Sequence, residues 1–309
     1  MRFLFVGAGA IGGYFGGRLV QKGEDVTFLV RSTKQKQLED EGLAIKSVHG
    51  DFQTPVRTIT YGEKAEPFDC IIIAVKAYHL PQVMMDLTPF VGEHTMILPL
   101  LNGYKHFGIL QQHFGAEKVL GGLCYIETTL DSNGAIIQSS SFHSIVFGEW
   151  AGGESERMQI LLSHLDKAGF TVILSSDIQR EVWQKYIFVA SLSGITTLMD
   201  SSVGPILASP TARAIYEQLL NEIVSIAQSA GMPVGPDMVS VTMQKMNSVL
   251  PEFTSSMHRD MLKHLPVEAE HLHGALLAMA MAVPGQVMYP ILETAYARLK
   301  VYESVNDMR

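Results

Sequence analysis

The sequence is poor in cysteine, in charge and in long apolar runs. Its 309 residues include only two cysteines, Cys70 and Cys124, which form no paired motif and lie in apolar stretches. They are expected to be reduced thiols in a core, as is usual for a cytoplasmic protein. The longest apolar run of the C-terminal half, residues 275–283, is too short to span a bilayer, so no membrane partner is expected.

Basic residues are also scarce. Lysine and arginine together number 23 against 31 aspartates and glutamates, the formal net charge is -8, and there is no basic run. This balance argues against a nucleic-acid partner. Hydrophobic residues make up 47% of the chain, which is enough for packed cores and argues against disorder. The length predicts two domains.

What the chain does have, near its start, is an apolar strand that runs into a glycine-rich turn. Residues 3–6 are Phe-Leu-Phe-Val, and the pattern Gly-x-Gly-x-x-Gly follows at once. In a dinucleotide site the first glycine permits a tight turn, the second admits the pyrophosphate, and the third lets the helix pack on the strand. The alternative is a turn that binds nothing. The residues predicted to contact a cofactor here are Gly7, Gly9, Ala10, Ile11 and Gly12.

The end of the second predicted strand, residues 26–30, indicates which dinucleotide binds. An NAD site carries an acidic residue about twenty positions after the glycines, whereas this chain has Arg31 there. A guanidinium offers a bidentate fork to a 2′-phosphate, which a carboxylate would repel. We therefore predict NADP(H) as the cofactor, with Arg31 as the main determinant. The alternative is an ordinary solvated arginine at a strand end.

Strands and helices alternate through the first half of the chain and then give way to helices alone. Further strands are predicted at residues 43–45, 56–61, 70–75, 95–101, 121–130, 135–139, 144–147 and 170–174, with a helix at 157–167. Apolar spacing predicts later helices at 178–199, 211–230, 237–265 and 267–282. The expected fold is α/β: a Rossmann domain with a doubly wound, mainly parallel sheet at residues 1–176, then an all-α domain at residues 177–309.

Polar residues follow two of the buried strands and are candidates for a site. Lys76 follows the strand at 70–75, and Asn102 follows the strand at 95–101. The carboxyl ends of parallel strands are where such sheets bind ligands. We therefore expect both residues near cofactor and substrate, the alternatives being a solvated strand end and a plain turn.

Two groups of titratable residues stand out in the helical half. Lys185 lies among aromatic and apolar residues, and partial desolvation lowers the pKa of a lysine, which suits proton donation. Glu181, four residues earlier, offers the alternative of a surface ion pair. In the segment 264–274, Glu268 and His271 share a helical face. A metal would need further carboxylates from partner helices, so no metal is expected. An acid–base or orienting carboxylate is favoured over a solvated helix start.

Together these features resemble the ketopantoate reductase family (2-dehydropantoate 2-reductase), and the resemblance extends nearly from end to end. The residues that carry it are the glycine turn, Arg31, 75–77, 102–103, 181–185, 255–257, Asp260, Glu268 and Gly274. The family reduces a 2-keto acid with NADPH on the route to pantothenate and coenzyme A. The resemblance implies a Rossmann domain, a helical domain and an active site in the cleft between them.

The resemblance also implies roles for single residues. Lys185 is similar to the family's general acid, which protonates the C2 ketone oxygen as hydride arrives. Glu268 resembles the carboxylate that binds the substrate hydroxyl and orients the lysine, and Asn102 resembles the residue that positions lysine and substrate next to the cofactor. Ser256 resembles the serine that binds the substrate carboxylate, and Lys76 the lysine between cofactor and substrate.

The chain departs from the family pattern at three positions. Asparagines common four and eight residues after the lysine are Val189 and Ser193 here, and one often found five residues after the glutamate is His273. Lost amides remove hydrogen bonds worth roughly 0.5–1.5 kcal/mol each. A different small 2-keto acid is therefore one alternative, and a non-catalytic NADP(H)-binding sensor is another. A homodimer is expected because the helical half is rich in methionine. The predicted substrate contacts are Lys76, Asn102, Lys185, Val189, Ser193, Ser256 and Glu268.

Overall fold

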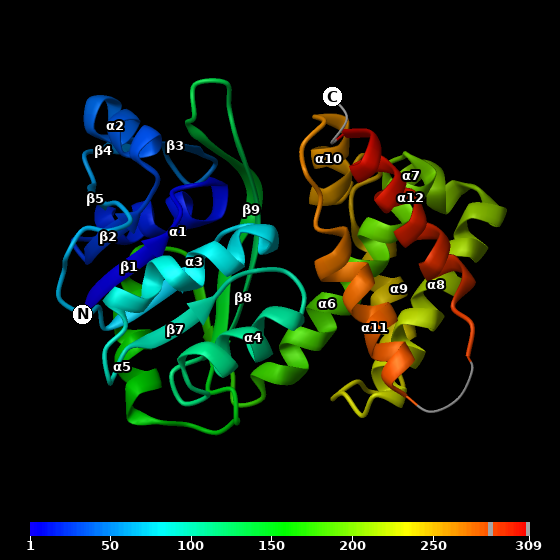
Figure 1. Ribbon diagram of the computed structural model, residues 1–309. Coiled ribbons are helices and arrows are strands. Elements are labelled where there is room, and N and C mark those ends of the chain that lie inside the picture. The colour runs from blue at the N-terminus through cyan, green and yellow to red at the C-terminus, as the bar shows by residue number, and fades with distance from the viewer. Residues whose placement is uncertain (284–286, 307–309) are drawn as a thin grey trace. The chain divides into compact units, whose positions relative to one another are not determined.

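The chain forms two compact units in a computed structural model that describes residues 1–283 and 287–306 (Figure 1). The first unit consists of Met1–Leu101 and His106–Glu181, and the second of Asn102–Lys105 and Val182–Arg309. Within the C-terminal domain predicted from the sequence, residues 284–286 and 307–309 lie outside the described part. The boundary expected between residues 176 and 177 stays a prediction.

The first unit is an α/β unit with two sheets. One sheet is wholly parallel, in the order β5-β2-β1-β6-β7, and the other has the order β10-β9-β3-β4, with β8 paired to β9. The strands are β1 (Arg2–Val6), β2 (Asp25–Leu29), β3 (Leu43–Ser47), β4 (Phe52–Thr54), β5 (Arg57–Ile59), β6 (Cys70–Ile73), β7 (Met96–Pro99), β8 (Gly121–Leu130), β9 (Ile136–Gly148) and β10 (Thr171–Leu174). The chain leaves β1 in one direction for β2 and returns to its other side for β6, which confirms the doubly wound arrangement.

Helices cover these sheets and connect their strands. They are α1 (Ala10–Gln21), α2 (Ser32–Glu41), α3 (Leu80–Leu87), α4 (Lys105–Phe114) and α5 (Glu156–Leu165), with short 3₁₀ turns η1 (Ala77–His79), η2 (Thr88–Phe90) and η3 (Asp166–Ala168). Strand β6 is buried along its whole length between β1 and β7, which explains its unbroken apolar sequence.

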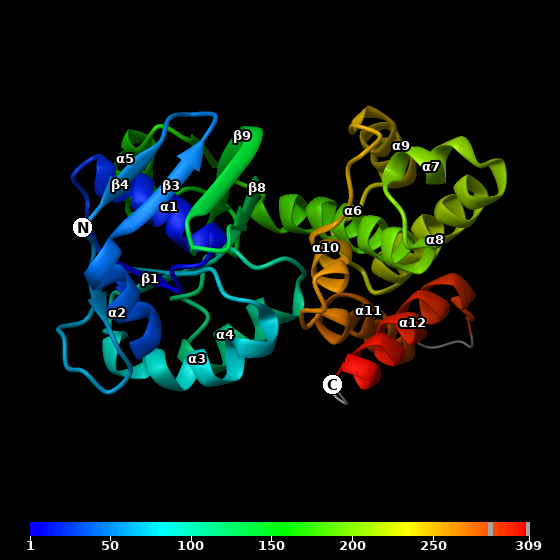
Figure 2. The same ribbon diagram turned by 90° about the horizontal axis from the view of Figure 1, so that it is seen from above.

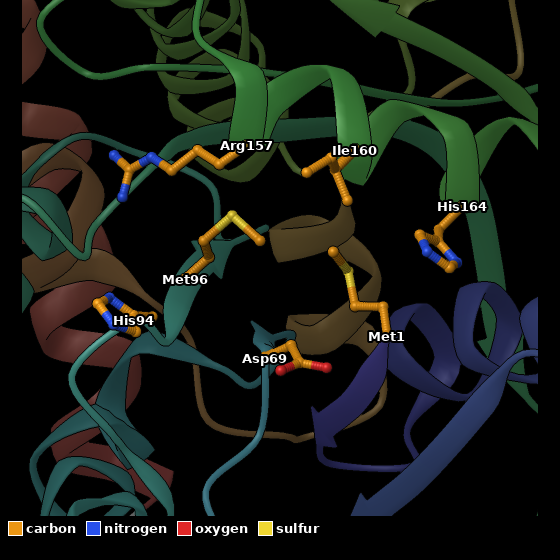
Figure 3. A pocket seen from close by; sticks show the side chains of 7 residues that line it. All are labelled: Met1, Asp69, His94, Met96, Arg157, Ile160 and His164. Atoms are coloured by element: carbon orange, nitrogen blue, oxygen red, sulfur yellow. The ribbon is translucent and has the colours of Figure 1, made fainter.

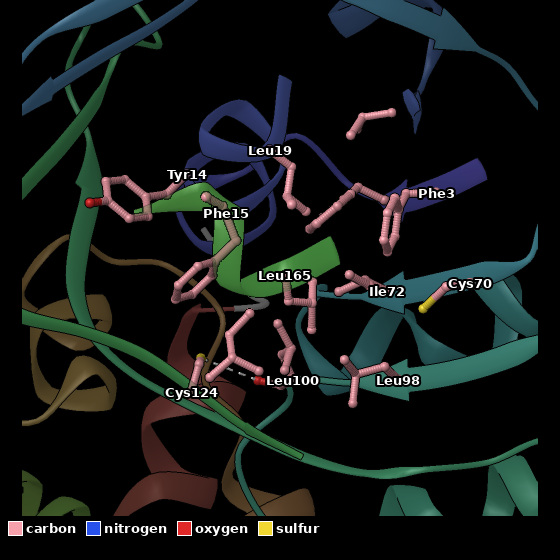
Figure 4. Close-up of a cluster of buried hydrophobic side chains, with 14 of the residues drawn as sticks. Phe3, Tyr14, Phe15, Leu19, Cys70, Ile72, Leu98, Leu100, Cys124 and Leu165 are labelled. Carbon is pink, nitrogen blue, oxygen red and sulfur yellow. Dashed lines mark hydrogen bonds between the residues drawn. The ribbon is translucent and has the colours of Figure 1, made fainter. Parts of the chain in front are cut away.

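Helix α1 lies between the two sheets and contacts strands of both. A Cβ atom on Gly13 would lie 2.5 Å from Ile136, and one on Gly16 would lie 2.7 Å from the ring of Phe28. The small residues of α1 therefore let it fit closely between the sheets. Larger residues of the same helix, with both cysteines, fill the core shown in Figure 4.

The second unit is helical, as expected. It contains α6 (Ile178–Met199) from Val182 onward, α7 (Val203–Ala208), α8 (Pro210–Ser229), α9 (Met238–Ser248), α10 (Ser256–Leu262), η4 (Glu270–Gly274), α11 (Ala275–Ala282) and α12 (Pro290–Asn306). Helix α8 contacts α7, α9, α11 and α12 (Figure 2). In residues 1–283 and 287–306, no helix is both long and apolar enough to cross a membrane.

The predicted helix at 237–265 was wrong, because the chain there forms two helices, α9 and α10. Pro251 follows α9, and a proline disfavours the helical conformation in the residue before it. Ser255 then starts a new helix, with its side chain accepting a hydrogen bond from the His258 amide at 3.0 Å. Helix α12 was not predicted, and the predicted helix at 267–282 includes the π-helical turn η4.

Candidate active site

The glycine turn lies at the carboxyl edge of the parallel sheet. Gly7 follows β1 with φ of 89°, and its amide donates to the carbonyl of Leu29 at 2.9 Å. A Cβ atom on Gly12 would lie 2.3 Å from the Gly7 carbonyl oxygen, so only glycine fits there. A Cβ atom on Gly9 would meet no atom within 4 Å. The protein's own packing therefore does not require glycine at position 9, whereas close approach of a pyrophosphate would.

The first turn of α1 is open to an anion. Gly9 is the N-cap residue, no side chain caps the helix, and no acidic residue lies in its first turn. The amides of Ala10 and Ile11 belong to the first turn, whose N–H groups have no partner within a helix. The positive end of the helix dipole adds to their attraction for phosphate. These residues fit a dinucleotide.

Arg31 and the Lys76 segment meet at the same edge. Arg31 is the exposed N-cap residue of α2, and its guanidinium donates to Nδ1 of His79 at 3.5 Å. Burial, and then the charge of Arg31, lower the pKa of His79. Lys76 directly precedes this turn, and the nearby Val75 side chain lies 3.3 Å from where a Cβ on Gly7 would be. The structure thus brings the predicted cofactor residues of the first unit together.

The segment Asn102–Lys105 belongs to the helical unit, although it directly follows the parallel sheet in sequence. The Asn102 carbonyl accepts a hydrogen bond from Nε2 of His271 at 3.0 Å. The ring of Tyr104 lies 4.7 Å from the ring of Trp183, which is two residues before the predicted catalytic lysine in α6. Asn102 is therefore grouped with the helices that carry the other predicted catalytic residues.

Lys185 lies on α6 and is only 8% exposed. Its neighbour Tyr186 donates a hydrogen bond from its hydroxyl to the Leu272 carbonyl in η4, at 2.5 Å. Burial raises the pKa of the Tyr186 phenol, which remains neutral. One turn of α6 is thus tied to the Asn102 segment through Trp183 and to η4 through Tyr186.

Glu268 lies two residues before η4 and is half-buried. Its carbonyl accepts from the Leu272 amide at 3.0 Å, and its charge acts on His271. Burial lowers the pKa of His271, and the nearby Glu268 carboxylate offsets that shift in part. Single π-helical turns occur often at functional sites. Glu268, Lys185 and Asn102 are thus carried by three segments that contact one another.

Ser256 is the half-buried first residue of α10. Hydrogen bonds made by its neighbours Ser255 and His258 hold this end of the helix in place. The side chain of Ser255 bonds to that of Thr196 on α6 at 2.8 Å. Buried His258 bonds through Nε2 to Asp200 at 2.9 Å. These ties join residues 58 and 59 positions apart, so no local sequence signal could have revealed them.

The positions that depart from the family pattern are engaged within the helical unit. Buried Ser193 donates its hydroxyl to the Val189 carbonyl at 2.6 Å. Buried His273 donates from Nε2 to the Ala190 carbonyl at 2.9 Å, and its Nδ1 has no hydrogen-bond partner among the described residues. Burial lowers the pKa of His273 to about 4. Substrate contact by Val189 and Ser193 stays a prediction.

A pocket of about 310 Å³ lies at the opposite, amino edge of the parallel sheet (Figure 3). Two of its polar residues are paired within the protein: Arg157 with Glu149 at 2.5 Å, and His164 with Glu24 at 2.7 Å. It is remote along the strands from the glycine turn and is not where a dinucleotide would bind. Within the described ranges, no group of three or more histidine, cysteine or acidic residues could hold a metal ion.

Comparisons with known proteins find matches to one family along nearly the whole chain. Residues 3–152 match the family model "Ketopantoate reductase PanE/ApbA", and residues 177–303 match the model of its C-terminal part. An uncharacterized oxidoreductase, YkpB, from Bacillus subtilis (strain 168) is 43% identical, over 98% of this chain and 99% of that protein. A 2-dehydropantoate 2-reductase from Nostoc sp. is 28% identical, over 99% and 96%.

Solved structures share the fold. The crystal structure of 2-dehydropantoate 2-reductase from Geobacter metallireducens GS-15 has a TM-score of 0.88 at 26% identity, covering 97% of this chain and 99% of that one. The structure of D-mandelate dehydrogenase with NADH and anilino(oxo)acetate has a TM-score of 0.89 at 20% identity, covering 99% and 100%. The matched models span both units, and the chain belongs to the ketopantoate reductase family of oxidoreductases.

Proposed function

We propose that the protein reduces a 2-keto acid with NADPH, and that ketopantoate is its preferred substrate, reduced to pantoate for pantothenate synthesis. The observation that carries the proposal is that α6, the Asn102 segment and η4 are held together by direct contacts. The turn that holds buried Lys185 is tied to the segment of Asn102 and to the turn beside Glu268. A buried lysine, an amide and a carboxylate on linked segments are the groups that ketone reduction requires.

The chemistry divides between cofactor and protein. NADPH, when bound, supplies a hydride to the C2 carbon of the keto acid. The Lys185 ammonium donates a proton to the ketone oxygen, and its charge stabilises the negative charge that develops there. Glu268 accepts a hydrogen bond from the substrate hydroxyl and orients Lys185. Asn102 positions the substrate, and the Ser256 hydroxyl donates to its carboxylate.

The choice of NADP(H) over NAD(H) rests on the first unit. Exposed Arg31 at the end of β2 would pair with the 2′-phosphate, while the glycine turn and the first turn of α1 would hold the pyrophosphate. Lys76, beside the glycine turn, would contact cofactor and substrate. No acidic residue lies in the first turn of α1 or α2 to oppose these anions.

A different 2-keto acid is the second candidate, favoured by Val189 and Ser193. Val189 offers no amide, and the Ser193 hydroxyl is engaged by its own helix. D-mandelate dehydrogenase, of the same fold, has been solved with anilino(oxo)acetate, which carries an aromatic group. Val189→Asn separates the candidates: it raises kcat/KM for ketopantoate if a less polar keto acid is the natural substrate.

The test is the loss of NADPH absorbance when ketopantoate or another 2-keto acid is added to the purified protein. We expect turnover with at least one, and ketopantoate to have the highest kcat/KM. A different best substrate would favour the second candidate. NADPH binding without oxidation by any keto acid would identify a sensor instead of an enzyme.

We also propose a cytoplasmic homodimer. Both cysteines are buried and neither forms a disulfide, as in proteins of reducing compartments. Met281 and Met288 of the helical unit are 81% and 77% exposed, and a dimer interface would bury such apolar side chains. Light scattering on a size-exclusion column measures the mass directly, and a mass of one chain would exclude the dimer.

A further inference from the structure

A single imidazole joins two segments of the helical unit that are 169 residues apart in sequence. Nε2 of His271 donates to the backbone carbonyl of Asn102 at 3.0 Å. Resting on the proposed function, we propose that His271 is a positioning residue: it holds the Asn102 segment against the turn that follows Glu268, so that the Asn102 amide is presented to the substrate.

The backbone of the segment is built for this contact. Gly103 has φ of 93°, a conformation that side-chain-bearing residues rarely adopt. A Cβ atom there would lie 3.0 Å from Nε2 of His271 and 3.1 Å from the Leu272 side chain. Glycine therefore lets the imidazole lie directly against the chain next to the carbonyl that it binds.

Two further contacts of the segment are made by the side chains of Lys105 and Tyr104, not by Asn102. Lys105 lies 3.9 Å from Glu270, but both side chains are about half exposed, and such surface pairs contribute little. Tyr104 contacts Trp183 through their rings. The His271 hydrogen bond acts on Asn102 itself. It holds the backbone of Asn102 at a fixed distance from η4, the turn that contains His271.

The position of His271 is in turn set by η4. The π-helical turn Glu270–Gly274 is anchored to α6 by the hydrogen bond from Tyr186 to Leu272. Glu268 lies two residues before this turn and His271 within it, and the Leu272 amide donates to the Glu268 carbonyl at 3.0 Å, so adjoining backbone carries the carboxylate and the imidazole. Because the imidazole is neutral near pH 7, the Asn102 carbonyl also fixes its proton on Nε2.

A double-mutant cycle in the full-length enzyme tests the inference. His271→Phe removes the hydrogen-bond donor, whereas His271→Gln keeps a side-chain N–H group within reach of the Asn102 carbonyl. Asn102→Ala removes the side-chain amide but keeps the backbone carbonyl that His271 binds. Rates are measured with the 2-keto acid that oxidises NADPH fastest. We expect His271→Phe to lower kcat about 10-fold with the Kd for NADPH unchanged, and His271→Gln to stay within about 3-fold of wild type. In the Asn102→Ala background, His271→Phe should lower kcat by less than about 2-fold further.

Hydrogen exchange of the amides of residues 102–105 provides a readout independent of activity. We expect faster exchange in His271→Phe than in His271→Gln or wild type. The inference would be overturned by equal exchange rates in His271→Phe and His271→Gln. It would also be overturned if the losses of kcat caused by His271→Phe and Asn102→Ala were fully additive. If His271→Phe does not fold, Gly103→Ala displaces the imidazole from the other side and should raise the exchange in the same way. A wild-type enzyme with no turnover overturns the proposed function instead, and the exchange then still decides whether His271 holds the segment.

Discussion

Arg31 is the residue on which the choice of cofactor depends. It is exposed at the end of β2, next to the turn that follows Lys76, with no carboxylate in the first turn of its own helix. A guanidinium bonded to a 2′-phosphate contributes about 1.5–3 kcal/mol. That contribution should separate NADPH from NADH.

We therefore expect Arg31→Asp to weaken NADPH binding roughly 10- to 100-fold and to improve NADH binding. Fluorescence titration with each cofactor measures both Kd values. Lys36→Asp, an equal charge change at an exposed position of the same helix, is the control and should leave the ratio unchanged. An unaltered preference in Arg31→Asp would remove this residue from cofactor selection.

At the scale of single residues, the sequence singled out side chains with a local signal. Lys185 stands out because its neighbours are aromatic, and Arg31 because of its distance from the glycines. The hydrogen bond from His271 to Asn102 leaves no such signal, because it depends on a contact between segments 169 positions apart. Pattern reasoning placed His271 beside Glu268 but could not say what its ring contacts.

Among the elements, α10 owes its position to the polar contacts of His258. That residue is 4% exposed and bonds to Thr254 at 2.7 Å and to Asp200 at 2.9 Å. Together with the bond between Ser255 and Thr196, these contacts hold the first turn of α10, and so Ser256, against the end of α6.

His258→Leu should lower the free energy of unfolding by about 1–3 kcal/mol, because it removes two hydrogen bonds made by a buried imidazole, to Thr254 and to Asp200. If Ser256 binds the substrate carboxylate, KM for the keto acid should rise about 10-fold with kcat nearly unchanged. Urea unfolding and steady-state kinetics measure the two effects, and His264→Gln, at an exposed position, serves as control. A normal KM in a destabilised His258→Leu would separate α10 from substrate binding.

Elements defined by local pattern were predicted well, and those defined by interruptions were not. The glycine turn, β2 and the buried β6 follow from short-range spacing and were confirmed. The prediction of one helix across 237–265 gave no weight to Pro251 or to the capping residue Ser255, because the apolar spacing continues through both. Whether β3 joins the first sheet or a second one depends on long-range pairing that the sequence does not display.

On the scale of the whole molecule, each unit contains a histidine that burial keeps neutral. The pKa of His143 in the first unit falls from 6.5 to about 4, because of burial and then the nearby His49 and Arg18. The pKa of His273 in the second unit falls to about 4 through burial. In the unfolded chain both would take up a proton below pH 6.5. Their stabilising contribution is therefore complete above pH 6.5 and is lost as the pH falls towards 4.

We expect Tm to fall between pH 6.5 and 4.5, by roughly 2–4 °C for each kcal/mol lost. Differential scanning calorimetry at half-unit steps measures this fall. Carboxylates such as Glu149, whose pKa lies below its ordinary 4.5, act only at lower pH. His143→Gln, which can still accept the hydrogen bond from Tyr14, should show a shallower fall. An identical profile in this variant would exclude His143 as a source.

The central claim, that Lys185 is the proton donor of an NADPH-dependent keto-acid reductase, is tested most directly by Lys185→Ala. Two quantities are compared with wild type: kcat from NADPH absorbance with the best 2-keto acid, and the Kd for NADPH from fluorescence. Lys300→Ala, an ordinary surface lysine paired with Glu303, is the control. The account predicts that kcat falls about 10²–10⁴-fold in Lys185→Ala while the Kd for NADPH is unchanged. Turnover equal to that of wild type would contradict it.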